Sequence, residues 1–171
     1  MYLGGAFGSS PSDVNPYAAS TFYAVDRYAS YQKVWREDYR AGGLILSDRY
    51  TTSNAVHQTG KLPEGEWEDF LRWLFDFEYG KLELPEPDQV IYLDMPTQRA
   101  AELLRRREGA THTAGDIHEV DTAYLARCRQ VALRAAGLCG WTRVSCVDEA
   151  GAVRAPEDLH REIWAIVQSI L

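Results

Sequence analysis

Three residues with chemically useful side chains follow a short apolar run at positions 44–46. Asp48, Arg49 and Tyr50 bring a carboxylate, a guanidinium group and a phenol to the end of that run. An arginine can hold a phosphate through two charge-assisted hydrogen bonds, and a carboxylate can hold Mg²⁺. These residues therefore predict a phosphate site in which Asp48 is a candidate magnesium ligand. The alternative is an Asp–Arg ion pair that only ends a strand.

Four polar residues come next, and a single helical turn would present them together. They are Ser53, Asn54, His57 and Gln58. Their donors and acceptors suit a sugar hydroxyl or the edge of a base. The alternative is a solvated first turn of a helix with Ser53 as its cap.

An aromatic residue and an arginine share a helix face upstream of this segment. Tyr23 and Arg27 are four positions apart, so both side chains lie on the same side of a helix. A flat ring beside a guanidinium group suits a nucleobase, since one stacks and the other donates to a carbonyl. The alternative is that Tyr23 belongs to the hydrophobic core.

The elements that must position these residues alternate between helix and strand. Long helices between short apolar strands predict βαβ units, and hence an α/β fold with a parallel sheet and helices on both faces. In such sheets, ligands bind beyond the carboxyl ends of the strands. The expected strands are 44–47, 89–95 and 141–148, and the expected helices are 16–40, a short one after Ser53, 64–82, 96–107, 117–138 and one at the carboxyl terminus.

Composition limits the kind of protein this is. The 171 residues suffice for a single domain, residues 1–171, with a real core. A net charge of −7 argues against a general nucleic-acid binder. No apolar run approaches the roughly 18 residues of a membrane span, and the start of the chain does not resemble a signal peptide. Three cysteines without a CxxC pair fit free thiols, so a cytoplasmic location is expected.

Several collinear segments of the sequence resemble bacterial thymidylate kinases. The segments are FYAVDR, ILSDRYTTSNAVHQ, VIYLDMP and DIHEVDTAYLARCR, and with the last strand they extend over nearly the whole chain. The resemblance implies transfer of the ATP γ-phosphate to dTMP in dTTP biosynthesis, with Mg²⁺ as cofactor. It also implies the three-layer fold of P-loop nucleoside-monophosphate kinases, and a homodimer.

The resemblance also assigns roles to individual residues. It implies that Tyr23 stacks on thymine, that Arg27 donates to a thymine carbonyl, that Arg49 binds the dTMP phosphate and that Asp48 lies near the metal and the phosphates. Ser53 and Gln58 match residues that contact the base or the sugar, and His57 stands where the family usually has a tyrosine beside the deoxyribose. Tyr50 and Asn54 belong to the same substrate-binding segment.

A mobile lid over ATP is expected at about residues 108–118. That segment has no lysine or arginine, so a catalytic arginine from this region must be one of the three before it: Arg105, Arg106 or Arg107. The alternative for these arginines is a solvated helix end that complements the helix dipole.

One motif of such kinases does not occur in the sequence, namely the phosphate-binding loop GxxxxGK[ST]. We therefore expect the first strand and the P-loop to be absent from this chain, which would then be inactive without that amino-terminal segment. The alternative is a non-catalytic remnant that binds a pyrimidine nucleotide or a partner chain.

Overall fold

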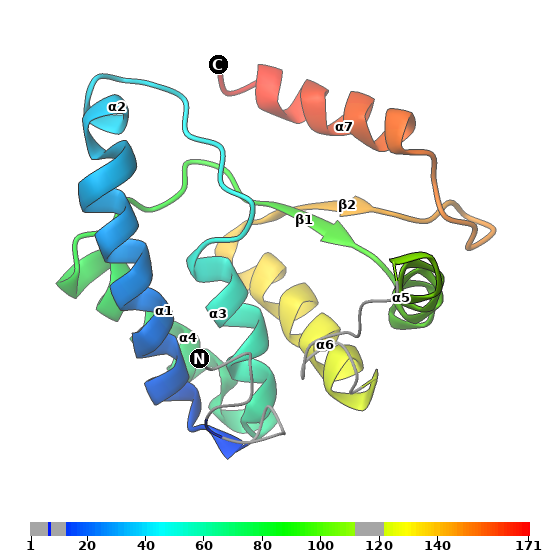
Figure 1. Cartoon of the computed structure of the whole chain (residues 1–171), viewed down its shortest axis with the longest axis horizontal. Coiled ribbons are helices and arrows are strands. Elements are labelled where there is room, and N and C mark those ends of the chain that lie inside the picture. The colour runs from blue at the N-terminus through cyan, green and yellow to red at the C-terminus, as the bar shows by residue number, and fades with distance from the viewer. Residues whose placement is uncertain (1–6, 8–12, 112–121) are drawn as a thin grey trace. The chain divides into compact units, whose positions relative to one another are not determined.

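The computed structural model describes residue 7 and residues 13–111 and 122–171, with the backbone alone at 107–111. The chain divides into two compact units, Met1–Pro87 and Asp88–Leu171. Figure 1 shows the helices and strands of both units.

A long helical segment opens the first unit. It consists of α1 (Pro16–Ser30), the π-helical η2 (Tyr31–Trp35) and α2 (Arg36–Arg40). The backbone N–H of Tyr17 donates to Asn15 Oδ1 at 2.8 Å, so Asn15 caps the helix as its type predicts. Gly42 follows the last turn with a φ of +84°, a conformation that glycine adopts without strain. The predicted helix 16–40 is therefore confirmed.

The remaining elements of the first unit are also helical. They are α3 (Thr51–His57), η3 (Thr59–Lys61), η4 (Glu64–Glu66), α4 (Trp67–Phe75) and the π-helical η5 (Asp76–Lys81). The apolar face of α4 is buried, as its spacing predicts. Helix α3 begins at Thr51, before the position expected from a Ser53 cap, and no side chain caps its first turn.

The strand predicted at residues 44–47 does not form. This stretch pairs with no other strand among the described residues, and the side chains of Leu44 and Leu46 are 66% and 92% exposed. Successive side chains of an extended chain point to opposite sides, so Leu44 and Leu46 lie on the side opposite Ile45. No other part of the described structure covers that side. The prediction of a buried strand here was wrong, because an apolar run becomes a strand only where a neighbour pairs with it.

The second unit contains two strands that pair in parallel. They are β1 (Ile91–Asp94) and β2 (Thr142–Ser145), with Ile91 opposite Thr142. Helices α5 (Thr97–Thr111) and α6 (Thr122–Cys139) come between them in the sequence, and α7 (Pro156–Gln168) follows. Helix α6 contacts β1, α7 contacts β2, and Figure 1 draws the two helices on opposite sides of the strand pair. This is the expected parallel α/β pattern, with two of the three predicted strands.

The first residues of the predicted lid are helical. Helix α5 continues through Thr111, so residues 108–111 are helical and do not open a loop. The rest of the expected lid, 112–118, and the expected start of the next helix at 117 lie outside the described residues.

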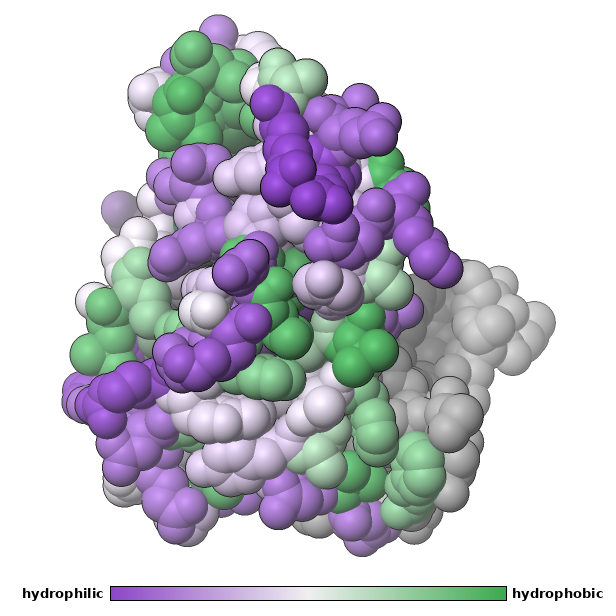
Figure 2. Space-filling model, turned by 90° about the vertical axis from the view of Figure 1, so that its left-hand side faces the viewer, coloured by the Kyte–Doolittle hydropathy of each residue, from purple (hydrophilic) through white to green (hydrophobic). Residues whose placement is uncertain are grey.

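The surface in Figure 2 alternates between separate apolar groups and polar residues. The exposed apolar side chains of the first unit include Phe22, Val25 and Val34. Within the described ranges, no helix is both long and apolar enough to cross a membrane.

Candidate functional site

A sharp backbone turn sets the start of α3. Arg49 has a φ of +67°, which is uncommon for a residue with a side chain. The hydroxyl of Ser47 donates to the carbonyl oxygen of Arg49 at 2.7 Å and supports this conformation. Such strain persists only where the surroundings hold it, and it is frequent at functional sites.

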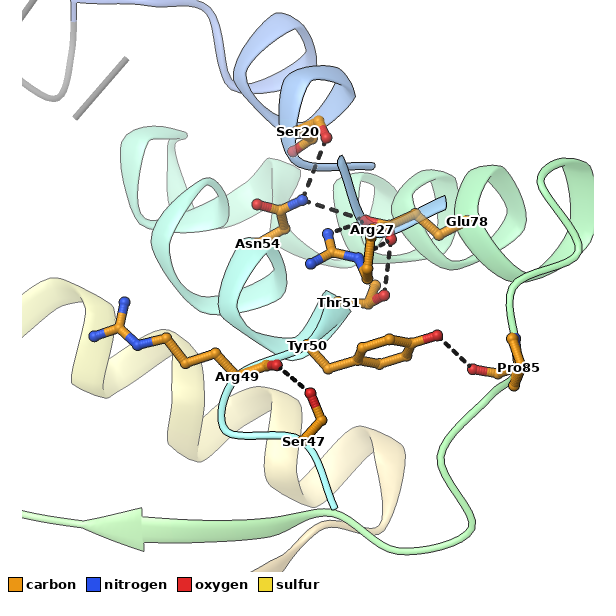
Figure 3. A network of polar contacts seen from close by, with 9 residues as sticks. All are labelled: Ser20, Arg27, Ser47, Arg49, Tyr50, Thr51, Asn54, Glu78 and Pro85. Carbon is orange, nitrogen blue, oxygen red and sulfur yellow. Dashed lines mark hydrogen bonds and ion pairs between the residues drawn. The ribbon is translucent and has the colours of Figure 1, made fainter. Parts of the chain in front are cut away.

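The side chains of Asp48 and Arg49 are exposed at this turn. Neither forms an ion pair with any residue in the described part of the chain. The alternative interpretation, an Asp48–Arg49 ion pair that ends a strand, is therefore wrong. Figure 3 shows the Arg49 side chain extending away from the polar network around Glu78. Both charged groups are available to a ligand.

Glu78 is the centre of a buried polar network in the first unit. Its side chain is fully buried in η5 and pairs with Arg27 of α1, whose Nε and Nη2 donate at 2.6 and 2.9 Å. From α3, Thr51 Oγ1 donates at 2.8 Å and Asn54 Nδ2 at 3.2 Å. Figure 3 shows these groups converging on one carboxylate. Four hydrogen bonds satisfy the buried charge and tie three elements together.

Tyr50 lies beside this network. Its hydroxyl donates to the carbonyl oxygen of Pro85 at 2.9 Å, and the Arg27 guanidinium carbon is 5.5 Å from the centre of its ring. Burial, the largest cause, raises the pKa of Tyr50 to about 12, although Arg27 opposes the shift. The phenol is therefore neutral at physiological pH, and its hydroxyl is engaged within the protein.

The four polar residues predicted to act together on α3 divide between two environments. Asn54 and Gln58 are buried, whereas Ser53 and His57 are half-buried. Gln58 Oε1 is buried without a hydrogen-bond partner among the described residues, as is Ser20 Oγ of α1. Buried polar atoms of this kind need water or a ligand to replace their lost hydration. Tyr23 is half-buried on α1 and does not belong to the buried core.

The second unit has its own buried carboxylate at the end of β1. Asp94, 1% exposed, accepts hydrogen bonds from Arg129 Nε and Nη2 at 2.6 and 3.0 Å and from Arg143 Nε at 2.8 Å. Burial raises the pKa of Asp94, but the hydrogen bonds and charges of the two arginines outweigh burial, so the pKa lies below its usual value.

The arginines predicted to assist at the lid lie on α5 in this unit. Arg105 and Arg106 are exposed, and Arg105 Nε donates to the carbonyl oxygen of Ala101 at 3.3 Å. The side chain of Arg107 lies outside the described part. The catalytic role of all three stays a prediction.

Glu78 and the arginine partners of Asp94 were not predicted from the sequence. A signal for Glu78 was present, because it follows Leu71 and Leu74 at positions i+7 and i+4. That spacing places an acidic residue on the apolar face of the helix. A charged residue on a buried face needs a partner, and Arg27 is the partner.

Known proteins similar to this chain share one name. A thymidylate kinase of Nitratidesulfovibrio vulgaris is 32% identical over 168 residues, which cover 95% of this chain and 73% of that protein. A thymidylate kinase of Mycobacterium tuberculosis is 30% identical over 105 residues, 61% of this chain and 48% of that protein. A probable thymidylate kinase of Pyrobaculum aerophilum is 23% identical over 158 residues, 92% of this chain and 71% of that protein. No family model matches the chain.

Proposed function

This chain belongs to the thymidylate kinase family, and we propose from that membership that the protein transfers the γ-phosphate of ATP to dTMP, giving dTDP. The observation that carries the proposal is the extent of the similarity, which covers 95% of the chain. Family membership implies the fold of nucleoside-monophosphate kinases. The single domain, the homodimer and the cytoplasmic location stay predictions.

The proposed acceptor site lies at the start of α3. Arg49 binds the dTMP phosphate, Tyr23 stacks on the base, and Arg27 and Asn54 face the edge of the base. Ser53, His57 and Gln58 contact the base or sugar, and the ring of Tyr50 borders the site. The exposure of Arg49 and the convergence of Arg27 and Asn54 on Glu78 support this arrangement.

Magnesium fits the exposed carboxylate of Asp48. Magnesium in such sites is held by one or two carboxylates together with substrate phosphates and water, so a single protein ligand is adequate. Asp48 has no ion-pair partner among the side chains described at 13–106 and 122–171, and its oxygens are therefore available to the ion. Asp48 would hold the ion, which would neutralise charge on the phosphates when bound.

The first test measures dTMP binding, because the acceptor site does not need the phosphate-binding loop. Calorimetric titration of the 171-residue chain with dTMP should give saturable binding, and turnover with ATP and Mg²⁺ is then measured separately. Binding with turnover would support the kinase. Binding without turnover is the result expected of a kinase acceptor site in a chain without the phosphate-binding loop, and it also agrees with the non-catalytic alternative. The lack of any dTMP binding would contradict the acceptor site.

Arg49→Ala should weaken dTMP binding by about tenfold to a hundredfold, since the phosphate loses charge-assisted hydrogen bonds. Deoxythymidine, which has no phosphate, should bind the variant and the wild type equally. Arg40→Ala is the matched control, because it removes the same charge from an exposed site on α2. Unchanged dTMP affinity in Arg49→Ala would show that the phosphate site lies elsewhere.

Tyr23→Ala should weaken dTMP binding by about five- to a hundredfold, which is the range for loss of one base–aromatic stack. The effect on ATP should be smaller. Tyr28→Ala is the control on the same helix, since Tyr28 is 40% exposed and has no proposed role in binding. Equal losses for dTMP and ATP would instead indicate a role of Tyr23 in packing.

A further inference from the structure

Glu78 leaves Arg27 and Asn54 with one unused polar group each. Arg27 donates to Glu78 from Nε and Nη2, so Nη1 remains. Asn54 donates from Nδ2 to Glu78 and, at 3.4 Å, to the carbonyl oxygen of Ser20, so Oδ1 remains. Figure 3 shows Oδ1 on the side of the amide turned away from Glu78. The two side chains therefore offer one donor and one acceptor.

The orientation of the Asn54 amide follows from the chemistry of its partner. An ionised carboxylate only accepts hydrogen bonds, so the nitrogen of the amide must face Glu78 and the oxygen must face away. Arg27 only donates, whatever its orientation. A carboxylate at position 78 thus determines which group Asn54 presents.

We propose that Glu78 is a positioning residue that sets base selectivity, by fixing Arg27 as a donor and Asn54 as an acceptor toward the acceptor nucleotide. This inference rests on the proposed function, which places Arg27 and Asn54 at the base. A 4-keto pyrimidine such as thymine has an acceptor, O4, which matches the donor of Arg27. Beside it is a donor, N3–H, which matches the acceptor of Asn54. Cytosine has a donor, the N4 amino group, beside an acceptor, N3, and so opposes both protein groups.

An amide in place of this carboxylate would disturb the arrangement in either orientation. An amide nitrogen at the position of Oε1 would face Arg27 Nη2 and Asn54 Nδ2, which both donate. Asn54 could avoid placing its donor against this amide nitrogen only if its side-chain amide flipped by half a turn. It would then present the donor Nδ2 to the base. An amide nitrogen at the position of Oε2 would face Arg27 Nε, which also donates. Arg27 would then lose its bidentate contact with the side chain at position 78.

The test compares the affinities of dTMP and dCMP, measured by calorimetric titration of the 171-residue chain. The wild type should bind dTMP more tightly than dCMP, and Glu78→Gln should narrow the ratio of the two dissociation constants by about tenfold, the effect of one mismatched buried hydrogen bond. Asp76→Asn is the matched control. It makes the same carboxylate-to-amide change in η5, at an exposed pair in which Asp76 Oδ2 is 3.4 Å from Lys81 Nζ, and should leave the ratio unchanged.

Glu78→Asp is the second variant, and circular dichroism checks the fold of both. Aspartate keeps the charge, but it is one methylene shorter and cannot reach both Arg27 and Asn54, so the ratio should narrow here too. If Glu78→Gln does not fold, the ratio of the dTMP and dCMP dissociation constants of Glu78→Asp alone tests the inference.

A wild-type ratio of the two dissociation constants in the folded variants, whether both affinities are unchanged or both fall by the same factor, would overturn the inference while leaving the proposed function intact. Failure of the wild type to bind dTMP would overturn both.

Discussion

Arg27→Leu should lower the free energy of unfolding of the first unit by about 3–5 kcal/mol, the cost of removing one partner of a buried ion pair. Glu78 is fully buried and would keep only the neutral donors of Thr51 and Asn54. Leucine fills much of the volume of the arginine stem, so the loss reports the uncompensated charge more than a cavity.

The double variant Arg27→Leu/Glu78→Leu separates the charge from the packing. Replacing both members of a buried pair by apolar residues is often close to neutral, so the double variant should regain most of the lost stability. Arg72→Leu is the control, because its pair with Asp69 is exposed and should contribute little. Urea denaturation followed by circular dichroism gives the free energies, and hydrogen exchange of peptides from α1 and η5 locates the change. A single variant as stable as the wild type would show that water reaches Glu78.

Much of the secondary structure follows from local signals in the sequence. Asn15 and Pro16 mark the start of α1, and Gly42 marks the end of the helical segment, because each acts on its own backbone. The two strands of the second unit follow from short apolar runs between helices. The run at 44–47 looks the same locally, but it lacks a pairing partner in the described structure, and the sequence of a run does not reveal its partner.

The candidate site was predictable as a set of residues but not as a network. The residue types after position 47 predict a phosphate site at Asp48 and Arg49, which stays a prediction, and the structure leaves both side chains exposed. The pairing of Arg27 with Glu78 joins residues 51 positions apart and depends on how α1 packs beside η5. The burial of Asn54 has the same origin, since its neighbour Ser20 also lies on α1. Contacts of this kind are set by tertiary packing, which single-residue patterns do not encode.

Asp94→Asn should destabilise the second unit by about 3 kcal/mol at pH 7, the lower end of the range for a broken buried pair. The lower end applies because Arg129 and Arg143 are 31% and 52% exposed and can turn toward water. The substitution nearly preserves volume, but the new amide nitrogen faces guanidinium groups that only donate. Three elements lose a common contact, since Asp94 lies on β1, Arg129 on α6 and Arg143 on β2.

The pH dependence of this difference tests its electrostatic origin. The pKa of Asp94 is lowered in the folded state because its two arginine partners outweigh burial. Its charge therefore stabilises the fold above the unfolded-state pKa of about 3.9, and this stabilisation is lost as the pH falls through the lower folded-state pKa. Urea denaturation should thus show the full difference between wild type and Asp94→Asn at pH 7 and a smaller one below about pH 4. Glu102→Gln, which alters an exposed pair with Arg99, should cause little change at pH 7. A difference for Asp94→Asn that stays constant through the acid range would mean that packing around the side chain, and not its charge, holds this end of β1.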